Sequence, residues 1–288
     1  MTPPDWFLQN MAETPIRQHI EVEGCAIETL AWGKIGARGL VFLHGNAATA
    51  EWWAPIAPFF SPDWRVSALT FSGSGRSGWR DSYTTDQFGR EVLAVAEATG
   101  VFEGAEKPWI VAHSLGGLIG LNAIATEAGS RFAGLILVDT GAQVPGRTMP
   151  GYAAKVRPGV ATLEEGMARV RLVQGPAGIP DWMMDHVART SLQQREDGLW
   201  YRCFDERVGD CIGTSRGSVF GFEEYTANAR CRIDFLWGEH SPIMDAPNVA
   251  YNRTLIPNGR FVELRGGAHN LMLELPLDFV ATVRELLD

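Results

Sequence analysis

The chain has 288 residues, of which 45% are hydrophobic and 20% charged, and its formal net charge is −9. This composition is typical of a globular protein and excludes a disordered or fibrous chain. Lysine and arginine form no clusters, so the sequence argues against nucleic acid or an anionic membrane as a partner, and we expect a small, neutral substrate. The length fits one large core with an inserted subdomain better than two independent domains.

The sequence contains four cysteines, Cys25, Cys203, Cys211 and Cys231. None is part of a CxxC pair or has a histidine at the spacing of metal ligands, so we expect free thiols in a reducing compartment and no metal site. The first residues lack a basic segment followed by an apolar one, and no run approaches the ~18 apolar residues of a membrane span. These features predict a cytoplasmic protein with no membrane partner.

The first half of the chain alternates predicted strands and helices. A short helical segment at residues 5–11 precedes a hairpin of residues 16–23 and 26–32, where apolar and polar residues alternate. Continuous apolar runs then predict buried parallel strands at 39–43, 64–71, 109–112 and 132–139. The segments between these strands predict helices around residues 52–59, 85–99 and 115–127. The alternation indicates an α/β fold with a doubly wound parallel sheet, whose functional residues lie at the carboxyl ends of the strands.

The alternation stops in residues 142–229. Prolines separate short helical pieces there, such as residues 163–173 and 182–194, and no buried strand is visible. A segment of this length is too long for a plain loop, so we interpret it as a mainly helical cap over the active edge of the sheet. The core then comprises residues 1–141 and 230–288, and its second part has predicted strands at 232–237 and 260–264 and helices at 246–255 and 276–287.

Ser114 has the sequence context of a nucleophile. The apolar run 109–112 ends just before it and a glycine-flanked helical run follows, which predicts a strand, a sharp turn and a helix. Such a turn exposes the hydroxyl and points the next backbone N–H groups at the group under attack. Ala112 and Gly116 occupy the small positions of a G-x-S-x-G motif, with alanine in place of the first glycine. The alternative is a structural turn that happens to contain a serine.

A nucleophilic serine needs a base and donors for an oxyanion. His269 lies in a small-residue loop, 266–270, and follows the serine in the chain order of such enzymes, so we predict that it is the base. The predicted oxyanion donors are the backbone N–H group of Leu115 and that of Asn46, with Ala47 as the alternative to Asn46.

The other histidines are predicted to be structural. His44 and His113 stand at strand ends beside the motifs, where we expect them to hold their turns by local hydrogen bonds. His19, His186 and His240 belong to no motif, and we expect them on the surface or in the cap.

As a group these residues resemble the α/β-hydrolase fold family. The resemblance covers nearly the whole chain from residue 16 and rests on four features: the loop His44-Gly45-Asn46, the turn Gly73-Ser74-Gly75-Arg76-Ser77, the turn at Ser114 and the loop at His269. It implies an eight-stranded, mostly parallel sheet, a cap inserted after strand six, and hydrolysis through an acyl-enzyme without a cofactor. Members with this layout include esterases, lactonases and carbon–carbon bond hydrolases.

The triad acid is missing from its usual place in the family. The loop after strand seven commonly carries an aspartate in a G-x-x-D turn, but here it reads Gly238-Glu239-His240-Ser241. Because functional groups collect at the carboxyl ends of parallel strands, we predict that the acid is Asp139, at the end of strand six. Some family members carry their acid there. Glu239 is the alternative, Asp245 is a weaker one, and a purely turn-forming role for Asp139 stays open.

These predictions describe a serine hydrolase that cleaves a small, neutral, apolar ester or lactone with a triad of Ser114, His269 and Asp139. Three alternatives stay open: a carbon–carbon bond hydrolase of the same fold, a ligand-binding or receptor-like member without catalysis, and dinucleotide binding by the G-x-G-x-x-G match at residues 73–78. The last is the weakest, because the match does not follow the first strand and no helix begins at its last glycine. The glycines more simply form a tight turn.

The sequence does not identify the substrate. Four large side chains of the cap, Trp182, Met183, Trp200 and Phe222, are candidates for an apolar acyl site. The same residues would serve equally well in the core of the cap, which is the commoner role of such side chains. The oligomeric state is likewise not indicated.

Overall fold

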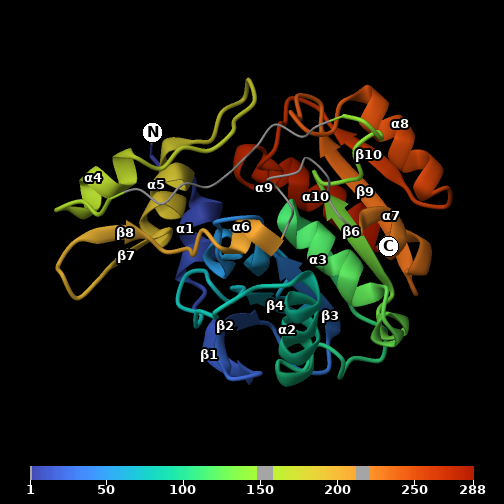
Figure 1. Ribbon diagram of the computed structural model, residues 1–288, viewed down its shortest axis with the longest axis horizontal. Helices are drawn as coiled ribbons and strands as arrows, with labels where there is room; N and C mark the ends of the chain where they lie inside the picture. The colour runs from blue at the N-terminus through green and yellow to red at the C-terminus, as the bar shows by residue number, and fades with distance from the viewer. Residues whose placement is uncertain (1, 148–157, 212–220) are drawn as a thin grey trace.

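A computed structural model describes residues 2–147, 158–211 and 221–288 of the chain (Figure 1). Its centre is an eight-stranded sheet with the strand order β1-β2-β4-β3-β5-β6-β9-β10. The pairs β1–β2 and β2–β4 are antiparallel and the other pairs are parallel, which confirms the predicted fold class and the mostly parallel sheet of eight strands. The strands are β1 (Ile16–Val22), β2 (Cys25–Trp32), β3 (Arg38–Leu43), β4 (Trp64–Leu69), β5 (Trp109–His113), β6 (Gly134–Val138), β9 (Arg232–Gly238) and β10 (Phe261–Leu264).

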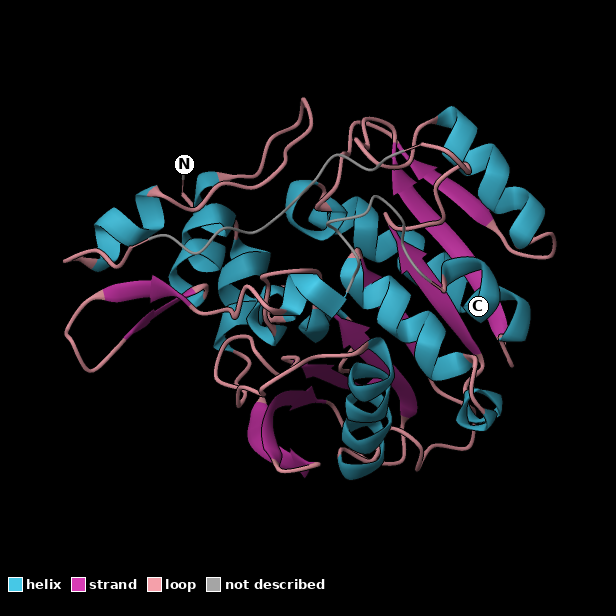
Figure 2. Ribbon diagram, in the orientation of Figure 1, coloured by secondary structure: helices cyan, strands magenta, loops and turns pink. Residues whose placement is uncertain are grey.

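Helices cover both faces of this sheet (Figure 2). One face carries α2 (Thr85–Ala98), α3 (Leu115–Ile124), α7 (Phe222–Asn228) and α8 (Ala246–Leu255). The other carries α1 (Asp5–Ala12), α9 (Leu271–Glu274), α10 (Pro276–Leu287) and the short 3₁₀ helices η1 (Ala50–Trp53) and η2 (Ala57–Phe59), while η3 (Glu127–Arg131) precedes β6. The helix predicted around residues 52–59 is broken into η1 and η2, because Pro55 and Pro58 each lack the N–H that a continuous helix needs.

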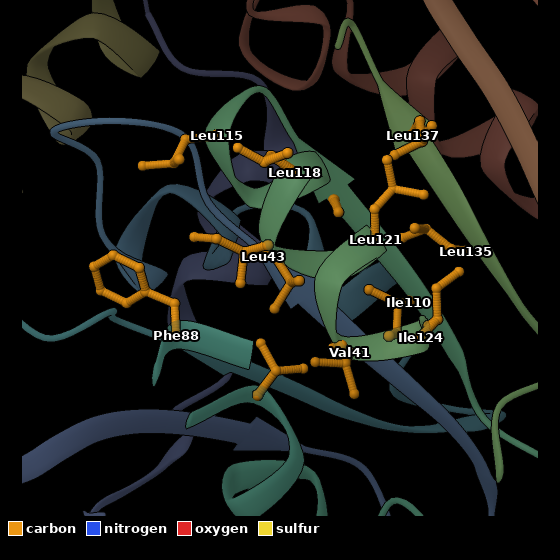
Figure 3. Close-up of a cluster of buried hydrophobic side chains, with 14 of the residues drawn as sticks. Val41, Leu43, Phe88, Ile110, Leu115, Leu118, Leu121, Ile124, Leu135 and Leu137 are labelled. Carbon is orange, nitrogen blue, oxygen red and sulfur yellow. The ribbon is translucent and has the colours of Figure 1, made fainter. Parts of the chain in front are cut away.

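The parallel strands are buried on both faces, which explains their continuous apolar sequences. In β3, Val41 and Leu43 pack into the core that contains α2 and α3, and Leu40 and Phe42 pack into the core on the opposite face. Figure 3 shows part of the first of these cores, where Leu121 and Ile124 of α3 lie beside Leu135 and Ile110 of the strands. The ends of β3, β5 and β6 are therefore held rigidly from two sides.

The described elements between β6 and β9 occupy the range that was predicted as a cap. They are α4 (Leu163–Ala168), α5 (Asp181–Thr190), the hairpin β7 (Leu192–Gln194) and β8 (Trp200–Arg202), and α6 (Val208–Cys211), followed by α7. The hairpin extends from the edge of the molecule opposite to α8 and β10 (Figures 1 and 2).

The helix predicted over 182–194 is present as α5 but ends at Thr190, and the hairpin takes the place of its last residues. The turn of the hairpin contains Asp197-Gly198, and Gly198 adopts φ +79°, which favours a tight reversal over a helix. Arg195 N–H donates to Leu199 O across the turn at 3.0 Å. The predicted helix over 163–173 is also shorter in the structure, where α4 ends at Ala168.

None of the described helices is long and apolar enough to cross a membrane. Cys25, Cys203 and Cys231 are free thiols, and the side chain of Cys211 lies outside the described part of the chain. Within residues 2–147, 158–211 and 221–288, no group of three or more His, Cys, Asp or Glu side chains is arranged to hold a metal ion. The cytoplasmic location stays a prediction.

Candidate active site

Ser114 occupies the tight turn between β5 and α3 and is half-buried. Its backbone has φ +52° and ψ −119°, in a region that residues other than glycine rarely adopt. Its N–H donates to Val138 O at 3.0 Å, which ties the turn to the neighbouring strand β6. A Cβ added at Gly116 would lie 2.7 Å from His44 O. Gly116 therefore lets α3 approach the end of β3 closely.

The His269 imidazole links Ser114 to Asp139. Its Nε2 atom lies 3.1 Å from Ser114 Oγ, and its Nδ1 atom lies 2.7 Å from Asp139 Oδ2. Because a carboxylate only accepts hydrogen bonds, the ring hydrogen resides on Nδ1 and leaves Nε2 to accept from the serine hydroxyl. The structure thus brings together three side chains that were predicted separately, in the order that a nucleophile, a base and an orienting acid would need.

Asp139 is completely buried just beyond the end of β6. Its backbone has φ +46°, and its N–H donates to Leu236 O at 2.8 Å. Besides His269, its carboxylate accepts from Ser241 Oγ at 2.9 Å and from Gly238 N–H at 3.2 Å. Burial raises the pKa of Asp139 above its usual value, while these hydrogen bonds favour the charged form. Two donors at the end of β9 therefore fix the carboxylate against the histidine.

The two alternative acids, Glu239 and Asp245, form hydrogen bonds with other groups. Glu239 accepts the backbone N–H of Gly266 at 2.9 Å, and its side chain is 45% exposed. Asp245 caps α8 by accepting a backbone N–H at 3.1 Å. Ser241, at the position of the aspartate in the usual G-x-x-D turn, donates its hydroxyl to Asp139. The sequence shows that this position is unusual but does not indicate this hydrogen bond.

The loop after β3, which contains Asn46, lies against Ser114. A Cβ added at Gly45 would lie 3.1 Å from Ser114 Cβ, so only glycine lets this loop approach so closely. His44 Nδ1–H donates to Gly45 O at 2.7 Å, and His44 Nε2 accepts from Phe71 N–H at 3.0 Å. Burial lowers the pKa of His44 to about 4, so the ring is neutral near pH 7. Because C=O and N–H point in opposite directions in a trans peptide, this bond turns Asn46 N–H away from the His44 ring.

Donors for an oxyanion are present beside Ser114. Among the described residues, no protein group accepts the backbone N–H of Asn46, Ala47 or Leu115. Leu115 directly follows the nucleophile at the first position of α3, where helix N–H groups have no partner within the helix. These N–H groups can therefore donate to a negatively charged oxygen near Ser114 Oγ.

Unusual backbone conformations gather at this site. Four described residues other than glycine have a positive φ, namely Glu23, Ala47, Ser114 and Asp139. Three of the four, Ala47, Ser114 and Asp139, belong to the candidate oxyanion loop, nucleophile and acid. Such conformations cost roughly 1–3 kcal/mol each and persist where the surrounding structure enforces them, often at functional sites. The unusual backbone conformations and the hydrogen-bonded side chains therefore mark the same site.

His113 has a different role from the local one predicted for it. Its Nε2–H donates to the backbone oxygen of His269 at 2.8 Å, so it contacts the base loop and not its own turn. The ring is buried, and burial, together with the neighbouring His269, holds the pKa of His113 well below its usual value. His44, by contrast, holds its own loop as predicted.

The buried neutral His44 predicts a loss of stability in mild acid. The pKa of this histidine falls from 6.5 to about 4 on burial, so the unfolded chain binds more protons between these values. The free energy of unfolding should then decrease as the pH is lowered through this range, by up to about 1.4 kcal/mol per pH unit for this proton. Denaturant unfolding at about pH 7 and about pH 5 measures the decrease.

The matched variants are His44→Gln and His19→Gln, since His19 is exposed. His44→Gln should show a smaller decrease between the two pH values than the wild type, and His19→Gln should show the same decrease. An unchanged decrease in a folded His44→Gln variant would contradict the prediction.

The G-x-G-x-x-G stretch forms a tight turn and not a phosphate site. Gly73 N–H donates to Gly78 O at 2.9 Å, Gly75 N–H to Cys203 O at 2.6 Å, and Gly78 N–H to Ala26 O at 2.8 Å. A phosphate-binding loop needs these N–H groups for its ligand. The structure therefore contradicts the alternative of dinucleotide binding at this stretch.

The four cap residues predicted to contact a substrate differ in their surroundings. Met183 and Phe222 are completely buried in the two cores, so neither offers surface to a substrate, and both are packing residues. The Trp182 ring packs against the Phe7 ring of α1, with the centroids 4.6 Å apart. Trp200, in β8, is half-buried and remains a candidate. Met183, Phe222 and Trp182 are thus packing residues, but they pack on the core around the large sheet and not in a separate core of the predicted cap.

Comparison with known sequences identifies the family. The sequence model of the alpha/beta hydrolase fold family matches residues 40–276, a range that contains Asn46, Ser114, Asp139 and His269. The chain belongs to the alpha/beta hydrolase fold family. This confirms the resemblance seen in the sequence.

Curated relatives of this alpha/beta hydrolase match parts of it. The pimeloyl-(acyl-carrier protein) methyl ester esterase of Edwardsiella ictaluri is 36% identical over 114 residues, which are 39% of this chain and 41% of the relative. The 2-succinyl-6-hydroxy-2,4-cyclohexadiene-1-carboxylate synthase of Pectobacterium atrosepticum is 38% identical over 82 residues, 28% of this chain and 30% of the relative. The chain thus spans less than half the length of each of these relatives.

Solved structures with this alpha/beta hydrolase fold match nearly the whole chain. The thioesterase domain from the curacin biosynthetic pathway aligns with a TM-score of 0.77 and 16% identity, covering 94% of this chain and 100% of that domain. E-2-(acetamidomethylene)succinate hydrolase aligns with a TM-score of 0.75 and 17% identity, covering 95% of this chain and 99% of that enzyme. At such low identity the likeness shows a shared fold and nothing about a shared substrate.

Proposed function

We propose that this protein is a serine hydrolase that cleaves a small, neutral ester or lactone through an acyl-enzyme, with Ser114 as nucleophile, His269 as base and Asp139 as orienting acid. The observation that carries the proposal is the pair of hydrogen bonds on the His269 ring, 3.1 Å to Ser114 Oγ and 2.7 Å to Asp139 Oδ2. A ring held in this way can take the serine proton on Nε2 while Nδ1–H stays on the carboxylate.

Acylation follows from this geometry. Ser114 Oγ attacks the carbonyl carbon as its proton passes to His269 Nε2, and the imidazolium that forms is stabilised by Asp139. The carbonyl oxygen becomes an oxyanion and accepts the N–H groups of Asn46 and Leu115. When the intermediate collapses, the bond to the alcohol oxygen breaks and His269 donates its proton to that oxygen.

Deacylation repeats the sequence with water as the nucleophile. His269 Nε2 takes a proton from water as the water oxygen attacks the acyl carbon. The same two N–H groups stabilise the second oxyanion. Collapse returns the proton to Ser114 Oγ and releases the carboxylic acid, so the enzyme ends in its starting state.

The names of the relatives support an ester as the substrate class. Two partial matches, from Edwardsiella ictaluri and Sodalis glossinidius, are methyl ester esterases. A third is named as the synthase of a cyclohexadiene carboxylate, which keeps carbon–carbon bond chemistry as the second candidate. The net charge of −9 disfavours an anionic substrate and supports a neutral one.

A substrate panel tests the proposal. Purified protein is offered p-nitrophenyl esters of increasing acyl length, several lactones and a set of vinylogous diketones, and kcat/KM is measured for each. We expect turnover of esters or lactones. Turnover of the diketones alone would favour the carbon–carbon bond hydrolase, and no turnover of any class, together with saturable binding of a panel member, would favour the non-catalytic alternative.

The assignment of the acid predicts a large difference between two near-isosteric variants. Asp139→Asn should lower kcat on one ester by about 10⁴, because the amide no longer holds the right tautomer of His269 or stabilises the imidazolium. Glu239→Gln should change kcat less than tenfold, since Glu239 accepts from the backbone of Gly266, lies 3.8 Å from His240 and is half exposed. Thermal melts check that both variants fold. A fall of three or more decades in Glu239→Gln with a small effect of Asp139→Asn would place the acid after β9.

A further inference from the structure

A buried carboxyl group that the proposed reaction does not use lies directly behind the base loop. Glu274 belongs to the short helix α9 and is 4% exposed. Its Oε2 atom accepts Ala268 N–H at 2.9 Å, and its Oε1 atom accepts Asn270 N–H at 2.8 Å. Because the two donors flank His269 in the sequence, one side chain holds the backbone on both sides of the base.

The peptide between His269 and Asn270 is held at both of its polar atoms. Glu274 accepts its N–H, and His113 Nε2–H donates to its oxygen at 2.8 Å. A peptide unit is planar, so bonds to both atoms fix its orientation and thereby the direction in which the His269 side chain leaves the backbone. His113 and Glu274 are both buried, so water does not compete for these bonds.

The same carboxyl group also reaches the cap. Its Oε2 atom accepts Gly175 N–H at 3.1 Å, and the neighbouring Asn270 Nδ2 donates to Val173 O at 2.7 Å. A Cβ added at Gly175 would lie 3.0 Å from Glu274 Oε2 and 3.1 Å from Ala268 Cβ, so the cap backbone packs tightly on the base loop. Glu274 therefore holds both the segment 173–175 and the loop that carries His269.

We propose that Glu274 is a positioning residue for the base: it fixes the orientation of His269 toward Ser114 and couples the cap segment 173–175 to that orientation. The inference rests on the proposed function, since it assigns His269 the role of base. Glu274 accepts three backbone N–H groups, which suits a carboxylate because it has acceptor sites only. It makes no described contact with Ser114 or Asp139 and acts through His269 alone.

The test variant is Glu274→Gln, which keeps the shape of the side chain and replaces one acceptor oxygen by an amino group. In one orientation of the amide, Asn270 N–H faces that amino group, and in the other, Ala268 N–H and Gly175 N–H face it. At least one backbone donor beside His269 thus loses its acceptor in either orientation. The control is Glu285→Gln, which removes the same charge from an exposed position of α10.

Two measurements are made on wild type, Glu274→Gln and Glu285→Gln. The first is the steady-state hydrolysis of p-nitrophenyl acetate, with kcat and KM resolved. The second is the low-field proton NMR signal of His269 Nδ1–H, which is assigned by its absence in His269→Ala. We expect Glu274→Gln to lower kcat by about 10²-fold, the size expected for a small misplacement of a reacting group, with KM changed by less than about threefold. The NMR signal should shift or broaden, and Glu285→Gln should match the wild type in both measurements.

The proposal is overturned if folded Glu274→Gln keeps kcat within about threefold of the wild type, if the loss appears only in KM, or if the NMR signal is unchanged. Should this variant not fold, Glu274→Asp serves in its place, since it keeps the charge and shortens the reach by one methylene. If the wild type hydrolyses nothing, the proposed function has failed, and the NMR comparison alone still decides whether Glu274 positions His269.

Discussion

Replacing Ser114 by alanine is expected to lower kcat on an activated ester by about 10⁶-fold. The hydroxyl is the atom that forms the acyl-enzyme, and loss of a triad nucleophile has an effect of this size in enzymes of the same chemistry. Ser114 is half-buried and gives one side-chain hydrogen bond, to His269, so the fold should tolerate its loss. Steady-state kinetics on one p-nitrophenyl ester, with a thermal melt of the same preparation, measures both effects.

Ser130→Ala is the matched control, because it removes one hydroxyl from an exposed serine that bonds only to its own turn. Its kcat should equal that of the wild type, and the melting temperature of both variants should stay within about 4 °C of the wild type. More than a few per cent of wild-type activity in a clean preparation of Ser114→Ala would exclude Ser114 as the nucleophile.

Replacing His269 by alanine is expected to be about as damaging as replacing Ser114. Without the imidazole, the residues that the structure describes offer the serine proton no hydrogen-bond acceptor, since its partner is His269 Nε2, 3.1 Å from Oγ. Residues that act as one unit do not have additive effects, so the variant with both replacements should be little worse than either single variant. The measurement is kcat on the same ester for the three variants.

His240→Ala is the control for this prediction. Its side chain is 44% exposed and belongs to the loop after β9, so its removal should leave kcat unchanged. A double variant that is slower than both single variants by several further decades would mean that Ser114 and His269 act independently. A folded His113→Ala variant as slow as His269→Ala would mean that the base has been wrongly assigned.

Much of the fold was predictable because the core strands are buried on both faces. Their runs are apolar throughout, as in residues 134–138, and such runs separated by helical segments leave few topologies besides a doubly wound sheet. The segment predicted as a cap was harder to predict, because its elements are short and separated by irregular stretches, so no long periodic pattern marks them. The Asp197-Gly198 signal for the hairpin was present in the sequence, but the helical pattern before it overrode it.

The position of Asp139 was predictable for a similar reason. A residue at the carboxyl end of a parallel strand lies at the active edge of the sheet. Asp139 and Glu239 were therefore both candidates for the acid. The sequence could not show that Ser241 and the backbone of Gly238 would donate to Asp139. These contacts join strand ends that are about a hundred residues apart in the chain.

The contacts of Glu274 could not be predicted from the sequence. Its position, before Pro276 and on a short helix, resembles that of an ordinary surface glutamate. Only the fold turns its carboxyl group back onto the backbone beside His269. Local patterns therefore predicted the reacting groups, whereas the residues that orient them depend on contacts that form in the folded chain.

The measurement that tests this account most directly is covalent labelling with a fluorophosphonate, followed by mass spectrometry of the labelled peptides. An activated serine attacks phosphorus and stays phosphonylated, whereas an ordinary serine hydroxyl does not react at neutral pH. The account predicts one label per chain, located on Ser114, with labelling abolished in Ser114→Ala and strongly slowed in His269→Ala. A label on another residue, or no label in a preparation that hydrolyses esters, would contradict it.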